Sequence, residues 1–158
     1  MNIGIDFGGV LSIHDEKCDP LEKGDHVNTS INMPDAIETL LKLKQNGHKL
    51  YLISFCGKKR AIETKESLSK YQDLFENQFY TKDRTYKGFL CNYLKCDIMI
   101  DDRQDVLEKV SENSPFTKNI LFNHPLLGWK EVFDIINDHQ RIEINQSVTN
   151  VSKYCYNV

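Results

Sequence analysis

The sequence predicts an α/β domain with three layers, in which helices cover both faces of a mainly parallel, Rossmann-like sheet. Short apolar, β-branched segments alternate along the chain with longer segments of helical periodicity, as in consecutive βαβ units. The length of 158 residues suits one domain with a substantial core. The charged fraction (27%) and the apolar fraction (40%) are ordinary for a globular protein, which excludes disordered and fibrous classes.

Strands are predicted wherever a short run is dominated by apolar and β-branched residues. These runs cover residues 2–7, 48–54, 79–81, 97–100 and 119–122. Gly8-Gly9 breaks the first run and Gly57 follows the second, because glycine interrupts regular structure.

Helices are predicted between these strands. Pro34 begins the first helix and Asn46-Gly47 ends it, because proline suits a first helical turn and Asn-Gly suits a helix end. The other helical segments cover residues 59–71, 84–94, 105–111 and 129–137.

Two segments fall outside this alternation. Residues 11–33 are polar and irregular, and a loop of that length in a compact domain predicts a functional or mobile flap. Residues 139–158 are polar and β-branched, which leaves open an extra edge strand or a loose tail. The predicted domain therefore covers residues 1–138.

Charge and cysteine content narrow the function classes. A net charge of −3 argues against a broad basic surface for long nucleic acid, although a local basic loop could still hold a phosphate. No apolar run has membrane-spanning length, and the strand-like start lacks the pattern of a signal peptide. The five cysteines are odd in number and form no C-x-x-C pair, so we expect free thiols and a cytoplasmic protein.

Chemically active side chains follow the predicted strands. Asp6 comes after the first strand, Ser54 ends the second, Asp101 and Asp102 follow the fourth, and Lys87 lies on the preceding helix. Ligands of open parallel sheets bind at the carboxyl ends of the strands, so these side chains should converge there. Clustered carboxylates repel one another unless a hard cation lies between them, and oxygen ligands suit Mg²⁺. The metal would offset the charge of a phosphate that one carboxylate attacks.

Simpler readings exist for each motif alone. Asp6-Phe-Gly-Gly could be a strand followed by a turn, and Asp101-Asp102 could begin a helix. Their order and spacing together favour a joint metal and phosphate site. A basic segment at a predicted helix start, Lys58-Lys59-Arg60, has two interpretations: it binds a substrate phosphate, or it forms a solvated basic turn. Trp129 is expected to be a packed core residue rather than a base-stacking one.

Asp6-Phe-Gly-Gly-Val, the strand-ending Ser54, the lysine and Ile100-Asp-Asp together resemble the four motifs of the haloacid dehalogenase-like (HAD) superfamily. The resemblance covers roughly residues 1–137. Ile100-Asp-Asp-Arg-Gln-Asp and Gly128-Trp-Lys-Glu are most similar to the 5'(3')-deoxyribonucleotidase branch. No segment is long enough for an inserted cap domain, so the resemblance implies a capless or minimally capped fold.

The resemblance implies a role for each matching residue. Asp6 would form an aspartyl-phosphate, Ser54 would bind the transferred phosphate, and Lys87 matches the family lysine better than Lys82 does. The implied Mg²⁺ ligands are Asp6, the backbone carbonyl of Gly8, Asp101 and Asp102. The implied substrate-binding residues are Gly9, Ser54, Phe55, Lys58 and Lys87.

Gly8 departs from the family pattern. Phosphatases of this family usually carry a second aspartate there as general acid and base, a contribution worth about 10²–10⁴-fold in rate. Three explanations stay open at this point. His14 or Asp15 of the flap replaces the acid, the substrate has a good leaving group, or the protein binds without turnover.

The predicted function is a Mg²⁺-dependent phosphomonoester hydrolase that acts through an aspartyl-phosphate. The resemblance implies a small phosphate ester as substrate, plausibly a nucleotide, while an uncapped site would also admit a phosphorylated end of a macromolecule. The alternative is an inactive phosphate- or Mg²⁺-binding interaction module, motivated by Gly8. A phospho-accepting receiver domain is disfavoured, because receivers place the acidic pair before the nucleophile.

Overall fold

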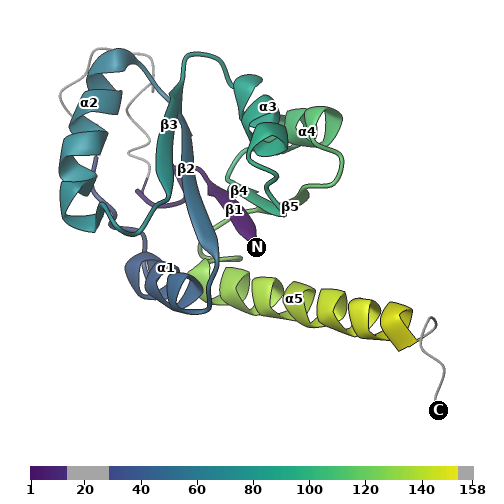
Figure 1. Cartoon of the computed structure of the whole chain (residues 1–158). Helices are drawn as coiled ribbons and strands as arrows, with labels where there is room; N and C mark the ends of the chain where they lie inside the picture. The colour runs from purple at the N-terminus through teal and green to yellow at the C-terminus, as the bar shows by residue number, and fades with distance from the viewer. Residues whose placement is uncertain (14–28, 153–158) are drawn as a thin grey trace.

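The computed structural model describes residues 1–13 and 29–152, without the side chains of residues 145 and 147–152. Its centre is a five-stranded parallel sheet of order β3-β2-β1-β4-β5 (Figure 1). The strands are β1 (Asn2–Ile5), β2 (Lys49–Phe55), β3 (Asn77–Thr81), β4 (Ile98–Asp101) and β5 (Lys118–Leu121). The predicted α/β fold class is confirmed. β1 is the central strand, with Ile5 opposite Leu52 on one side and Ile100 on the other.

Helices cover both faces of this sheet (Figure 1). They are α1 (Ala36–Gln45), α2 (Lys58–Ser67), the 3₁₀ helix η1 (Leu68–Tyr71), α3 (Tyr86–Tyr93), α4 (Gln104–Asn113) and α5 (Trp129–Ser152). α1 packs against α5, and α3 packs against α4. The helix predicted over residues 59–71 is α2 together with η1.

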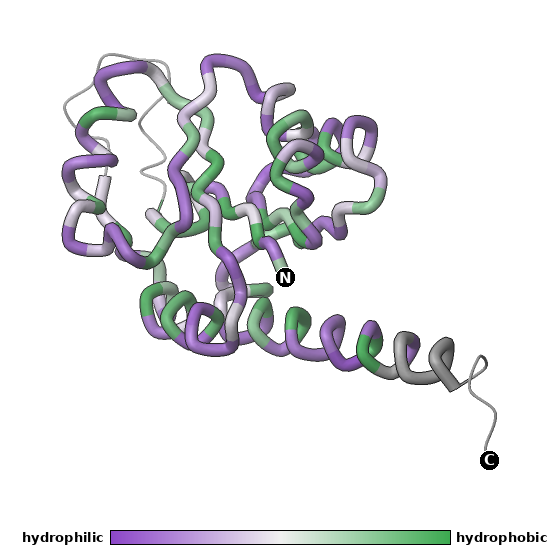
Figure 2. The backbone as a smooth tube through the Cα atoms, viewed as in Figure 1, coloured by the Kyte–Doolittle hydropathy of each residue, from purple (hydrophilic) through white to green (hydrophobic). Residues whose placement is uncertain are grey.

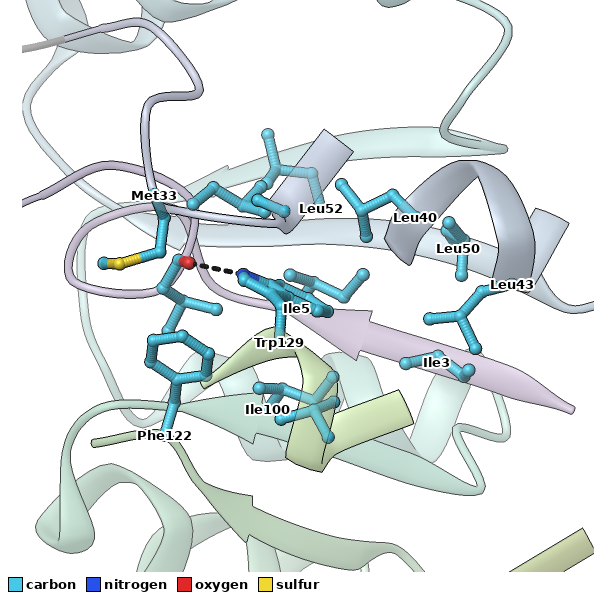
Figure 3. Packing of buried hydrophobic residues seen from close by; sticks show 14 of the residues in the cluster. Ile3, Ile5, Met33, Leu40, Leu43, Leu50, Leu52, Ile100, Phe122 and Trp129 are labelled. Atoms are coloured by element: carbon cyan, nitrogen blue, oxygen red, sulfur yellow. Dashed lines mark hydrogen bonds between the residues drawn. The ribbon is translucent and has the colours of Figure 1, made fainter. Parts of the chain in front are cut away.

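Two hydrophobic clusters fill the spaces on the two faces. Successive residues of a strand point to opposite faces, so Leu52 and Ile100 join one cluster while Ile53 and Met99 join the other. The larger cluster contains residues of α1 and α5, including the fully buried Trp129 (Figure 3). Trp129 is thus a core residue, as predicted. Figure 2 shows the contrasting hydrophilic colouring of the loop that connects β3 to α3.

Two glycines allow close packing in the smaller cluster. A Cβ at Gly4 would lie 2.8 Å from Sδ of Met99. A Cβ at Gly88 would lie 2.7 Å from the backbone carbonyl of Lys109, which belongs to α4. Gly4 therefore leaves room for the Met99 side chain of the neighbouring strand β4, and Gly88 allows close approach of α3 to α4.

The C-terminal prediction is wrong over residues 139–152, because α5 continues as one helix to Ser152 rather than becoming an edge strand or tail. Starting a helix is costly but extending one is cheap, so the turns begun at Trp129 continue through the β-branched stretch. In Figure 1 the second half of α5 extends beyond the sheet. None of the helices among the described residues has the length and apolarity to cross a membrane.

The predicted flap is only partly described. Its first residues, Leu11 and Ser12, are buried, as is Met33 at its end, so both ends belong to the packed body rather than to a loose loop. The central part of the flap, with His14 and Asp15, lies outside the described residues, and so do residues 153–158.

Candidate active site

A tight turn after β1 places Asp6 at the carboxyl edge of the sheet. The Asp6 N–H donates to the carbonyl of Ile100 (3.0 Å), which continues the pairing of β1 with β4. The carbonyl of Phe7 then accepts the N–H of Leu11 (2.9 Å), and Gly9 adopts a left-handed backbone with φ of 75°. Gly9 suits this conformation because it has no Cβ. Gly8 lies within this turn and pairs with Ser12.

Lys87 lies between the predicted nucleophile Asp6 and the predicted metal ligand Asp101. Its Nζ is 2.8 Å from Oδ1 of Asp6 and 2.7 Å from Oδ2 of Asp101. All three residues are buried, with Lys87 only 2% exposed. α3 supplies the lysine, β4 supplies Asp101 as its last residue, and Asp6 follows directly on β1. The structure therefore brings together three residues that are up to 95 positions apart in the chain.

The charges of Asp6 and Asp101 stabilise the charged form of Lys87. Burial alone would lower the pKa of Lys87, but the charges of Asp6 and Asp101 outweigh it and raise the pKa above its ordinary value. The Lys87 ammonium therefore stays charged. Burial raises the pKa of Asp101 to about 7, and the charge of Asp6 adds to this effect while Lys87 opposes it. A site with this excess of negative charge favours a further cation.

Asp6, Asp101 and Asp102 offer a donor set that fits magnesium. One carboxylate oxygen of each lies within 4.8 Å of the others. Hard divalent cations prefer such carboxylate oxygens. The other Asp101 oxygen, Oδ1, accepts the backbone N–H of Arg103 at 3.0 Å, which fixes the carboxylate plane. The Arg103 guanidinium pairs with Asp105 (2.9 Å), so it steadies the start of α4.

Ser54 is the second-last residue of β2, the strand that pairs with β1, and it is buried. The sequence analysis did not assign Cys56, a buried residue two positions after Ser54. Burial raises the pKa of the Cys56 thiol, and the charges of Asp6 and Lys87 also act on it. The end of β2 therefore lies near Asp6 and Lys87. No sequence motif identifies Cys56, since only its buried position next to Ser54 connects it to the site.

The other predicted substrate residues lie around this edge. Phe55 follows Ser54, and the guanidinium of Arg84 lies over its ring at 4.4 Å from the centroid. Lys58 is exposed at the first position of α2. Gly9 lines a cavity of about 480 Å³ together with Asp102. The remaining lining residues, which the sequence analysis did not assign, are Ile13, Met33, Leu121, Phe122, Asn123 and His124.

Comparisons with known proteins identify solved structures with a similar fold. No family model matches the sequence, and no curated protein matches it significantly. Among solved structures, an uncharacterized protein from Listeria monocytogenes serotype 4b is similar with a TM-score of 0.62 and 16% identity, covering 89% of this chain and 98% of the other.

Two further solved structures share the fold. The D,D-heptose 1,7-bisphosphate phosphatase from B. bronchiseptica, complexed with magnesium and phosphate, has a TM-score of 0.56 and 10% identity, covering 87% of this chain and 98% of the other. A chain of the Pnkp1/Rnl/Hen1 RNA repair complex has a TM-score of 0.54 and 24% identity, covering 80% of this chain and 42% of the other. This chain therefore has the same α/β fold as a magnesium- and phosphate-bound phosphatase.

Proposed function

We propose that this chain is a Mg²⁺-dependent phosphomonoester hydrolase in which Asp6 is the nucleophile. The observation that carries the proposal is the position of the Lys87 ammonium between the carboxylates of Asp6 and Asp101, at 2.8 and 2.7 Å. A buried cation of this kind holds one carboxylate ionised for attack and orients the other. The shared fold of a phosphatase crystallised with magnesium and phosphate supports the proposal.

The proposed hydrolysis has two steps, formation of an aspartyl-phosphate and its hydrolysis. An Asp6 oxygen attacks phosphorus, so an aspartyl O–P bond forms while the ester O–P bond breaks and the leaving oxygen takes a proton from solvent water. A water molecule then attacks the phosphorus and gives a proton to solvent, while the aspartyl O–P bond breaks, phosphate leaves and the Asp6 carboxylate is restored. Ser54 donates its hydroxyl to a phosphate oxygen, and Lys87 balances the charge that the phosphate brings.

Magnesium belongs to this proposal because the donor set fits it. Asp6, Asp101 and Asp102 would hold the ion, and Gly8 would add its backbone carbonyl. When bound, Mg²⁺ would neutralise charge on the transferred phosphate. The free thiols of Cys56, Cys91 and Cys96 fit the proposed cytoplasmic location.

We also propose nucleotides among the substrates. Support comes from the resemblance of Ile100–Asp105 and Gly128–Glu131 to the deoxyribonucleotidase branch. Trp129 does not provide base recognition, because it is fully buried and its Nε1–H donates to the Val10 carbonyl. The specificity proposal therefore rests on the sequence resemblance, and a panel of nucleoside monophosphates tests it.

A second candidate is a phosphate- and Mg²⁺-binding module without turnover. Gly8 favours it, because glycine provides no acid for the leaving oxygen. The two functions share the same ligands but differ in the release of phosphate.

The deciding experiment measures phosphate release from p-nitrophenyl phosphate and a panel of nucleoside monophosphates, with and without Mg²⁺. The matched variants are Asp6→Asn and Asp73→Asn, the latter at an exposed position. Metal-dependent release that is lost only in Asp6→Asn is expected. If the wild type binds Mg²⁺ but releases no phosphate, the binding module is the better description.

A further inference from the structure

The surface of α3 exposes a row of aromatic side chains that the proposed chemistry does not use. Tyr86, Phe89 and Tyr93 are 56%, 54% and 79% exposed. Their spacing places them on one face of the helix, while Lys87 and Cys91 are buried on the opposite face. Large exposed aromatics grouped in this way mark an interaction surface more often than an ordinary solvated face.

Cations lie at both ends of this row. Near its start, the Arg84 guanidinium stacks over the Phe55 ring at 4.4 Å. Beyond its end, the Lys95 ammonium lies 5.6 Å from the centroid of Phe116, which is itself 54% exposed. We call the set Phe55, Arg84, Tyr86, Phe89, Tyr93, Lys95 and Phe116 the aromatic-cation strip.

The strip begins beside the proposed active site. Tyr86 directly precedes Lys87, and Phe55 directly follows Ser54. The Cys56 N–H donates to the Thr81 carbonyl at 3.2 Å, so the loops that leave β2 and β3 run next to each other. Lys58, Lys82 and Arg84 lie on these two segments. Phe55, at the carboxyl end of β2, and Arg84 above its ring therefore lie at the edge of the sheet at which Asp6 lies, and we expect a ligand on the strip to extend to that edge.

The chemistry of the strip selects its partner. We propose that the strip binds single-stranded nucleic acid and directs a phosphorylated strand end to Asp6. The delivery of the strand end to Asp6 rests on the proposed phosphohydrolase function, whereas the binding does not. Aromatic faces stack on bases of any sequence, and interleaved cations follow the phosphate backbone. The α3 segment Tyr86–Tyr93 contains no Asp or Glu, so no carboxylate of that helix repels a polyanion. An acidic peptide would match the cations but would leave the row of aromatic rings unused.

The dimensions suit a short stretch of strand. The seven steps from Tyr86 to Tyr93 cover about 10 Å of helix. That distance corresponds to about two or three stacked nucleotides. The strip is thus a local site within an acidic protein, in keeping with the net charge of −3.

Direct binding tests the strip independently of catalysis. Fluorescence anisotropy with an unphosphorylated, labelled ten-nucleotide DNA strand of mixed sequence should show binding by the wild type that weakens with added salt. Tyr93→Ala should weaken this binding about tenfold, since one stacked base is lost, whereas Tyr93→Trp should retain it. Leu41→Ala is the matched control, because Leu41 is a similarly exposed apolar residue (47%) on α1.

Kinetics then test the link to the active site. In the wild type, the KM for a phosphorylated ten-nucleotide strand should be lower than the KM for a nucleoside monophosphate. Tyr93→Ala should raise the KM for the strand and leave the hydrolysis of p-nitrophenyl phosphate unchanged. Absence of strand binding by the wild type, or equal binding by Tyr93→Ala, overturns the inference and leaves a protein partner as the occupant. Hydrolysis of the aryl phosphate in that case preserves the proposed function. Strand binding without hydrolysis of any substrate overturns the proposed function and retains the strip.

Discussion

Trp129, the first residue of α5, donates its indole N–H to the carbonyl of Val10 over 2.8 Å inside the core. Figure 3 shows this bond as the dashed line that ends on the indole nitrogen. Val10 belongs to the turn that follows Asp6, and Trp129 also packs on Phe122, with ring centroids 5.7 Å apart. The last helix is thus connected directly to the turn that positions the proposed nucleophile.

Replacement of Trp129 by phenylalanine tests this connection. Trp129→Phe keeps an aromatic ring but leaves the buried Val10 carbonyl without its donor. The free energy of unfolding should fall by about 1–3 kcal/mol, measured by urea denaturation. Phosphate release should fall as well, since the turn after Asp6 loses a support. Unchanged stability would mean that water or another donor satisfies this carbonyl.

Removal of Lys87 should affect both stability and catalysis. Lys87→Met leaves Asp6 and Asp101 buried together without their cation, which costs about 3–5 kcal/mol of unfolding free energy. Phosphate release should drop by at least about 10²-fold. Urea denaturation and a phosphate assay measure the two effects. Lys82→Met at an exposed position is the control, and comparable losses in both variants would contradict the assignment of Lys87.

Gly88 should tolerate no side chain. In Gly88→Ala the new methyl group would meet the Lys109 carbonyl at 2.7 Å and Cβ of Asn113 at 2.9 Å, which forces α3 away from α4. We expect a loss of about 1–3 kcal/mol in thermal or urea unfolding. Gly57→Ala is the matched control, since no atom lies within 4 Å of a Cβ there. A stable Gly88→Ala protein would show that the two helices can shift at little cost.

Stability should depend on pH through His48. This side chain is 2% exposed, and burial lowers its pKa, with a further contribution from the N-terminal ammonium 3.3 Å from Nδ1. The folded state therefore binds fewer protons than the unfolded state, so stability is fully present above the unfolded pKa of about 6.5 and is lost as pH falls below it. His48→Leu should flatten the difference in urea midpoint between pH 7 and pH 5. His124→Leu, at an exposed histidine, should keep that difference.

Gly8 should make the reaction sensitive to its leaving group. Without an acid at position 8, the wild-type rate should fall steeply from aryl to alkyl phosphates. Gly8→Asp should raise the alkyl phosphate rate by about 10²-fold or more and change the aryl rate little. A wild-type rate that is insensitive to the leaving group would instead point to an acid elsewhere, with His14 and Asp15 as the first residues to replace.

Local sequence was sufficient to predict much of the fold. Runs such as Leu50–Ile53 are apolar on both faces, as expected for a strand buried between two helical layers, and the structure places them there. The C-terminal segment was predicted wrongly, because its β-branched residues argue locally against a helix. Helix extension from Trp129 prevails over that local preference.

The site was predicted less completely. Asp6 and Asp101 were found because each comes at the carboxyl end of a predicted strand, and Lys87 because it matches the lysine of the HAD motifs. The structure brings the charged atoms of these three residues together. Their catalytic roles stay predictions. The stacking of Arg84 on Phe55 had no sequence signal, because it arises from tertiary proximity alone.

The central position of β1 has a consequence for how activity is lost. β1 is paired on both sides, with β2 and β4, so its backbone opens only when the whole sheet separates. Asp6 follows directly on this strand, and its own N–H is bonded to Ile100. Fraying of the chain ends or of edge strands β3 and β5 leaves the nucleophile in place. Hydrogen exchange at Ile3–Asp6 should accordingly be among the slowest in the protein, and inactivation by denaturant should coincide with global unfolding rather than precede it.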